Sequence, residues 1–276
     1  MQRGAGIVLA GGRSSRMGRP KAWLEWHGST LLRRVVSVVA RGSGGPVVVV
    51  RAPGQDLPAL PPGTQIVEDE REGRGPLQGI AAGLRALQGR ADAAYVSSVD
   101  VPLLHPAFVA RVLAALEDDE IDVALPVADG HNHPLAAAYR VSLLGAVEGL
   151  LAADRLRPAF LFDAVRVRRL EEEELRPVDA DLASVLNLNA PADYDAARAR
   201  RAPEVTVQRF GALRRGGPRE AVPVYAATLG TAAAAAGVAL DGHVVAALNG
   251  DQISRDPEMP LASGDSVAFM AADAGG

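Results

Sequence analysis

The chain has 276 residues, a formal net charge of −4 at pH 7 and no cysteine. The absence of cysteine excludes disulfide bonds, thiolate metal sites and a cysteine nucleophile, and the slightly acidic balance gives no reason to expect a nucleic-acid partner. The sequence has no run of about 18 apolar residues, and its opening is too short and glycine-broken for a signal peptide. We therefore expect a cytoplasmic protein without a membrane partner.

Strand and helix signals alternate up to about residue 202. Thr30 is a typical N-cap for the run 31–42, and Gly42 is expected to end that helix. Residues 53–64 are expected to form a proline-rich surface connection. The alternation predicts an α/β fold, a Rossmann-like, mostly parallel sheet with helices on both faces. The expected strands are 7–9, 46–52, 65–69, 92–100, 122–128 and 135–141, and the helices are 31–42, 75–89, 106–118, 143–154 and 190–202.

The pattern changes beyond residue 202. Residues 205–213 alternate with period two and predict a half-buried strand, and 228–239 predict a small helix. Two more strands are expected, at 243–250 and 264–271. The chain therefore divides into a domain of residues 1–202 and a small α+β domain of residues 203–276. The acidic run 171–175 is expected to be a solvated face rather than a metal site.

Chemistry-bearing residues follow the ends of the predicted parallel strands. The loop "LAGGRSSRMGRPK" (9–21) leaves the first strand, and its paired glycines Gly11 and Gly12 let a ligand approach the backbone closely. This loop matches neither G-x-G-x-x-G nor G-x-x-x-x-G-K-[ST]. Asp69 and Asp100 end the third and fourth long strands, and the carboxyl ends of parallel strands meet at one edge of a sheet.

These residue types suit a nucleoside triphosphate with magnesium. A hard divalent cation takes one or two carboxylates together with substrate phosphates, and Asp100 fits this role. Lys21 and Arg16 carry the positive charge that would neutralise a triphosphate. The sequence therefore predicts a nucleotide site with Asp100 as the metal ligand and with Lys21, Arg16 and Asp100 as the catalytic residues.

Five motifs, in order, resemble those of the molybdenum cofactor guanylyltransferase family: "LAGGRSSRMGRPK", "GPLQGI", "SVDVPLL", "HPLAAAYR" and "NLNAPADY". The resemblance covers roughly residues 5–200 and implies a GT-A-like nucleotidyltransferase that moves GMP from GTP to molybdenum-molybdopterin and releases pyrophosphate. It implies that Lys21 contacts phosphate and that Asp69 and Asp100 belong to the GTP site, with Mg²⁺ on Asp100. It also implies a nucleotide contact from Leu9, Ala10 and Gly11, and a pterin side near Asn187 and Asn189.

One departure from the family leaves alternatives open. Family members carry an asparagine after the second strand that touches the nucleotide, whereas this chain reads "VVVVRAP" there. A cytidine nucleotide donor and a sugar-phosphate acceptor therefore remain as alternatives. A third alternative is a non-catalytic scaffold that only binds nucleotide.

The C-terminal segment resembles a second family. "VTVQRFGALR" opens it, "LASGDSVAFMAADAGG" closes it, and the last residues are Gly275 and Gly276. This is similar to the ubiquitin-like, β-grasp sulfur carriers, above all the small subunit of molybdopterin synthase and next the thiamine sulfur carrier. The resemblance implies adenylation of the terminal glycine and its conversion to a thiocarboxylate. The implied partners are an activating enzyme and the synthase large subunit, and the alternative is an ordinary frayed terminus.

Overall fold

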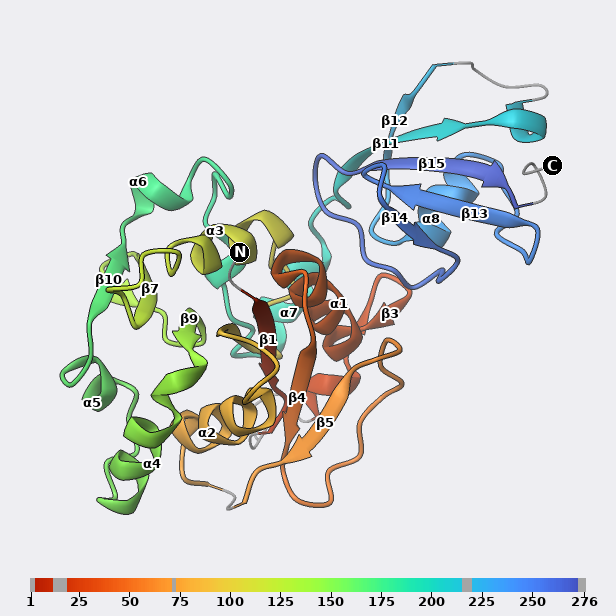
Figure 1. Cartoon of the computed structure of the whole chain (residues 1–276). Coiled ribbons are helices and arrows are strands. Elements are labelled where there is room, and N and C mark those ends of the chain that lie inside the picture. Colours follow the sequence, from red (N-terminus) through yellow and green to blue (C-terminus); the bar gives the residue numbers. More distant parts are fainter. Residues whose placement is uncertain (1–2, 12–18, 71–72, 215–219, 273–276) are drawn as a thin grey trace. The chain divides into compact units, whose positions relative to one another are not determined.

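The computed structural model describes residues 3–11, 19–70, 73–214 and 220–272 (Figure 1). Gly12, Arg16, Gly275 and Gly276 therefore lie outside the described residues. The chain forms two compact units, one of Met1–Leu24 and Thr30–Ala197 and one of Glu25–Ser29 and Arg198–Gly276. The sequence pattern did not predict that Glu25–Ser29 would be grouped with the C-terminal part.

The first unit is built on a mixed sheet with the strand order β10-β7-β9-β6-β1-β4-β5, and β8 pairs with β7. The neighbours β6, β1, β4 and β5 are parallel, as predicted. β9 instead runs antiparallel to both β6 and β7, because the connection from β7 is too short for a parallel crossover. The strands are β1 (Gly4–Leu9), β4 (Val47–Arg51), β5 (Gln65–Glu68), β6 (Ala93–Ser98), β7 (Val123–Ala128), β8 (His131–Asn132), β9 (Ala136–Arg140) and β10 (Val167–Leu170).

Helices cover both faces of this sheet (Figure 1). Alternate residues of β1 point to opposite faces, so Val8 joins one core cluster and Ile7 the other. The cluster with Val8 includes α1 and α3, and the cluster with Ile7 includes α2 and α4. The predicted Rossmann-like layering is thus confirmed. The helices are α1 (Leu31–Ser43), α2 (Pro76–Leu87), α3 (Pro106–Ala114), α4 (Leu144–Ala152), α5 (Ala159–Phe162), α6 (Glu172–Leu175) and α7 (Pro191–Arg198).

The predicted end of α1 was wrong by two residues. Thr30 is the N-cap and accepts a hydrogen bond from the Arg33 amide, as expected. The helix ends at Gly44, which has a φ of 64°, and Gly42 lies inside it. A Cβ on Gly42 would lie only 2.5 Å from Cβ of Val109, so this glycine allows α1 and α3 to pack closely.

The acidic run 171–175 lies largely in helix α6, with Glu171 and Glu173 exposed and Glu172 and Glu174 half-buried. Glu174 accepts hydrogen bonds from Arg111 and Arg168, and Glu172 pairs with Arg176. Within the described ranges, no three His, Asp or Glu side chains gather as a metal site, and no helix is long and apolar enough to cross a membrane.

The second unit has a five-stranded sheet in the order β12-β11-β15-β13-β14, with helix α8 (Leu229–Ala235). The first and last strands, β11 and β15, are parallel neighbours, and the other pairs are antiparallel. Its core packs β11, β13 and β15 against α8, with Phe269 fully buried. The sequence predicted α8, β11, β13 and β15 but not the edge strands. The strands are β11 (Glu204–Arg209), β12 (Val222–Tyr225), β13 (Val244–Leu248), β14 (Gln252–Ser254) and β15 (Ser266–Ala271), and the small pair β2 (Glu25–Trp26) and β3 (Ser29–Thr30) forms a separate two-stranded sheet.

Candidate functional site

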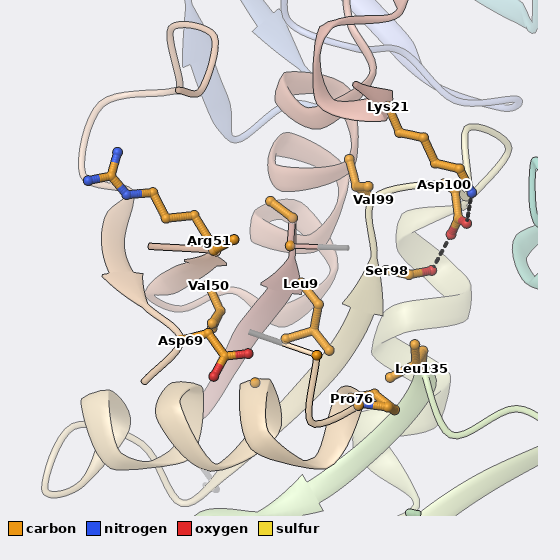
Figure 2. Close-up of a pocket in the computed structure, with 16 residues that line it drawn as sticks. Leu9, Lys21, Val50, Arg51, Asp69, Pro76, Ser98, Val99, Asp100 and Leu135 are labelled. Carbon is orange, nitrogen blue, oxygen red and sulfur yellow. Dashed lines mark hydrogen bonds and ion pairs between the residues drawn. The ribbon is translucent and has the colours of Figure 1, made fainter. Parts of the chain in front are cut away.

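A cavity of about 530 Å³ lies where β1, β4 and β6 end (Figure 2). Ligands of open α/β sheets bind at this carboxyl edge, where the sequence pattern predicts the site. The loop after β5 and the beginning of α2 complete the wall. The lining residues are Leu9, Ala10, Gly11, Lys21, Val50, Arg51, Ala52, Asp69, Gly73, Gly75, Pro76, Gly79, Ser98, Val99, Asp100 and Leu135.

The structure gathers most of the sequence-predicted residues in this cavity. Six described residues of the predicted nucleotide site line it: Leu9, Ala10, Gly11, Lys21, Asp69 and Asp100. They are separated by up to 91 positions in sequence (Leu9 to Asp100) and meet because β1, β5 and β6 run in the same direction. Their roles in catalysis stay predictions.

The carboxylate of Asp100 is held from two sides (Figure 2). Lys21 Nζ lies 2.6 Å from Asp100 Oδ2, and Ser98 Oγ donates to Asp100 Oδ1 at 2.6 Å. The side chains of Lys21 and Asp100 are only 17% and 14% exposed, so water screens this pair weakly. The cavity therefore contains one oriented carboxylate and one ammonium group in direct contact.

The donor set suits a hard cation only when a substrate completes it. Asp69 and Asp100 lie on opposite sides of the cavity in Figure 2. Within the described part of the chain, no cluster of three carboxylates or imidazoles exists to hold a metal alone. One carboxylate plus several phosphate oxygens is an ordinary magnesium environment, so Asp100 fits this group together with a nucleotide.

The segment "NLN" is attached to Asp100 through the backbone. The amide of Leu188 donates to the Asp100 carbonyl oxygen at 2.9 Å, and Leu188 itself is buried. The flanking Asn187 and Asn189 are exposed and do not line the cavity. The structure thus places both asparagines on the surface beside the Asp100 turn.

Arg74, which comes just before α2, is fixed to the end of α4. Arg74 donates to the carbonyl oxygen of Leu151 at 3.0 Å and to Asp154 at 2.7 Å. This contact supports the cavity wall at its neighbours Gly73 and Gly75. Gly75, the N-cap of α2, and Pro76 both line the cavity, so the positive end of this helix lies at the cavity.

Two polar side chains of this region were missed from the sequence. Ser98 precedes Asp100 by two residues, and the strand-end pattern predicts a role only for the carboxylate. Gln55 lies in the predicted surface connection, yet its amide nitrogen donates to the Ala10 carbonyl at 3.0 Å. No asparagine follows β4 directly, because the strand ends at Arg51 and Ala52 comes next. The sequence signal that could have indicated this contact is a glutamine directly after Pro53 and Gly54, close to the end of a strand.

Comparisons with known proteins agree with this arrangement. Residues 6–167 match the model of the MobA-like NTP transferase domain family. The "Probable molybdenum cofactor guanylyltransferase" of Mycobacterium tuberculosis (strain ATCC 25618 / H37Rv) is 38% identical over 190 residues, which are 68% of this chain and 92% of the relative. The relative of the same name from Mycobacterium avium (strain 104) is 37% identical over 195 residues, 70% of this chain and 93% of the relative.

Solved structures share the fold. The molybdopterin-guanine dinucleotide biosynthesis protein A of Archaeoglobus fulgidus superposes with a TM-score of 0.57 at 23% identity, over 70% of this chain and 96% of that one. A homologue of Rv0371c from Mycobacterium sp. strain JC1 gives a TM-score of 0.56 at 21% identity, over 71% and 96%. Because residues 6–167 match the family model and the relatives are 37–38% identical, the chain belongs to the MobA-like NTP transferase family and is a nucleotidyltransferase.

Proposed function

We propose that the first unit transfers GMP from GTP to molybdenum-molybdopterin and releases pyrophosphate in the cytoplasm. The observation that carries this proposal is the Lys21–Asp100 pair in the strand-end cavity. The names of the relatives at 37–38% identity support the choice of donor and acceptor.

The reaction is a substitution at the α-phosphorus of GTP. An oxygen of the molybdopterin phosphate forms a bond to this phosphorus, and the bond between it and the bridging oxygen to the β-phosphate breaks. Lys21 would neutralise the triphosphate, and Asp100 would hold its carboxylate toward the cation site in the orientation that Ser98 fixes. A magnesium ion held by Asp100 and the phosphates would supply further charge neutralisation. No covalent enzyme intermediate is needed, because positioning and electrostatics account for the catalysis.

The acceptor would approach from the side of Asn187 and Asn189. Both asparagines are exposed, and the backbone hydrogen bond from Leu188 holds them beside Asp100. Leu9, Ala10, Gly11 and Asp69 would hold the nucleoside. We propose the same role for Gly12, and a phosphate-neutralising role for Arg16.

The test is a transfer assay with the full chain, magnesium, molybdenum-loaded molybdopterin and one of GTP, CTP or ATP. We expect pyrophosphate release and a guanine dinucleotide product with GTP. Preferential use of CTP would identify a cytidylyltransferase. Transfer to a sugar phosphate but not to molybdopterin would identify another acceptor, and no turnover with tight nucleotide binding would indicate a scaffold.

We further propose that the second unit is a β-grasp sulfur carrier. The order β12-β11-β15-β13-β14, with parallel first and last strands at the centre and one helix packed on the sheet, supports a ubiquitin-like topology. The implied partners are an adenylating activating enzyme and the large subunit of molybdopterin synthase. Formation of a C-terminal thiocarboxylate with such an activating enzyme, ATP and a sulfur donor is the test.

A further inference from the structure

Both main-chain groups of Ala10, in the cavity wall, form hydrogen bonds, one to strand β4 and the other to Gln55 in the connection after β4. The Ala10 amide donates to the Val50 carbonyl at 2.8 Å, which continues the ladder between β1 and β4. The Ala10 carbonyl accepts a hydrogen bond from Gln55 Nε2 at 3.0 Å, beyond the end of that ladder. Ala10 is only 5% exposed, so its carbonyl depends on this partner more than an exposed group would.

Gln55 is itself held in one orientation. Its Oε1 accepts from the main-chain amide of Ala52 at 3.0 Å, and the main-chain amide of Gln55 donates to the Ala52 carbonyl at 3.1 Å. Arg51 Nη1 donates to the Gln55 carbonyl at 2.9 Å. Because the Ala52 amide can only donate and the Ala10 carbonyl can only accept, the two ends of the Gln55 carboxamide cannot exchange places.

This arrangement joins two stretches of the cavity wall. Gly11 lies so close to the end of β4 that a Cβ on it would be 3.3 Å from the Ala52 nitrogen. Gln55 does not line the cavity, whereas Ala10, Gly11 and Ala52 do. Any effect of Gln55 on a bound molecule must therefore pass through these backbone segments.

We propose that Gln55 is a positioning residue that fixes the Ala10–Gly11 backbone against Ala52 and so determines the affinity for the nucleoside triphosphate. The proposal rests on the proposed function, because it requires the cavity to be a nucleotide site. Lys21 and Asp100 reach the cavity from η1 (Lys21–Trp23) and from the end of β6, and they contact each other. The side chain of Gln55 instead contacts the backbone of Ala10 and Ala52. Gln55 should therefore act on binding rather than on the transfer step.

Two substitutions separate hydrogen bonding from packing. Gln55→Glu keeps the size of the side chain and an acceptor for the Ala52 amide, but it replaces the donor to the Ala10 carbonyl with a charged oxygen. Gln55→Ala removes both hydrogen bonds without adding repulsion. Gln88→Glu makes the same chemical change at an exposed position at the end of α2 and is the matched control.

The experiment measures the Kd of GTP by equilibrium dialysis with the full chain, and kcat at saturating GTP. We expect Gln55→Ala to weaken binding about 3- to 10-fold and Gln55→Glu at least about tenfold, with kcat within about twofold of the unsubstituted chain. Gln88→Glu should bind like the unsubstituted chain. Thermal melting of each variant checks that it is folded.

The order of the effects decides the proposal. Weaker GTP binding by Gln55→Glu than by Gln55→Ala supports the role of Gln55 as a hydrogen-bond donor. If Gln55 only filled space, the isosteric Gln55→Glu variant would bind GTP like the unsubstituted chain. Normal Kd values for Gln55→Glu, or a loss of kcat with an unchanged Kd, would overturn it. If the unsubstituted chain itself failed to bind GTP, the proposed function would fail instead, which is a different result.

Discussion

Replacing Asp100 with asparagine tests the candidate site in two independent ways. The change removes the charge that faces Lys21 Nζ at 2.6 Å, while the amide oxygen can still accept one hydrogen bond. A hydrogen bond between charged groups contributes about 1.5–3 kcal/mol, and part of it survives with asparagine, so we expect a loss of about 1–2 kcal/mol. Screening by solvent reduces this free energy only slightly, because the two side chains are 17% and 14% exposed.

The first measurement is thermal unfolding without added metal. A loss of about 1–2 kcal/mol corresponds to a decrease in Tm of roughly 2–8 °C for a unit of this size. The second measurement is GMP transfer with magnesium, where the loss of the charged ligand should lower kcat/KM by about 10³-fold or more.

Asp119→Asn is the control for both measurements, since Asp119 is fully exposed at 101% and lies outside the cavity. Turnover of Asp100→Asn close to that of the unsubstituted chain would refute the assignment of Asp100 as the metal ligand. An unchanged Tm without metal would refute the stabilising role of its contact with Lys21.

Three further changes test other parts of the first unit. GTP should be used in preference to CTP and ATP, and Gly11→Ala should lower kcat/KM for GTP several-fold, because the new Cβ would press on the Ala52 nitrogen at 3.3 Å; unchanged kinetics would remove this reasoning. Arg74→Ala should raise the KM for GTP about 3- to 10-fold by releasing the loop before α2 from α4, with kcat little changed, whereas a change in kcat alone would contradict it. Arg3 lowers the pKa of Asp92 to about 2, so Asp92→Asn should reduce the Tm at pH 7, and the difference should disappear as the pH falls from about 4 to about 2; a difference that persists at pH 2 would contradict the ion pair as its cause.

The position of the cavity could be predicted from the sequence, because the residues at which the parallel strands end can be recognised in the sequence pattern. Apolar runs that end in glycine or aspartate and alternate with helices predict that Gly11, Asp69 and Asp100 lie at one edge of the sheet. The run of valines in β4 predicts a strand, and the proline at the start of α2 is typical of the first turn of a helix, so both elements could be predicted from the sequence.

Contacts between distant segments could not be predicted in the same way. Gly42 is typical of a helix end in sequence. In the structure it lies inside α1, where the lack of a side chain allows α3 to pack closely against it. The direction of β9 depends on the length of the connection from β7. The short edge strands β12 and β14 are stabilised by pairing with β11 and β13, which their own residues do not indicate. The sequence predicts only a surface connection around Gln55, because loop composition does not indicate that its side-chain amide will donate to the Ala10 carbonyl.

The proposed sulfur carrier gives the last prediction, which concerns the second unit alone. We expect a protein produced with Gly276 as its last residue to gain about 16 Da on its C-terminal peptide, as sulfur replaces one carboxyl oxygen, after incubation with an activating enzyme, ATP and a sulfur donor. The sulfur must come from outside, because the chain contains no cysteine. Deletion of Gly276 should abolish the gain and leave GMP transfer unchanged, since the residues proposed for transfer belong to the other compact unit. If an activating enzyme that modifies its own carrier never adds this mass to the full chain, the five-stranded sheet with α8 serves another purpose and the carrier proposal fails. The assignment of the first unit as a nucleotidyltransferase stands on its separate observations.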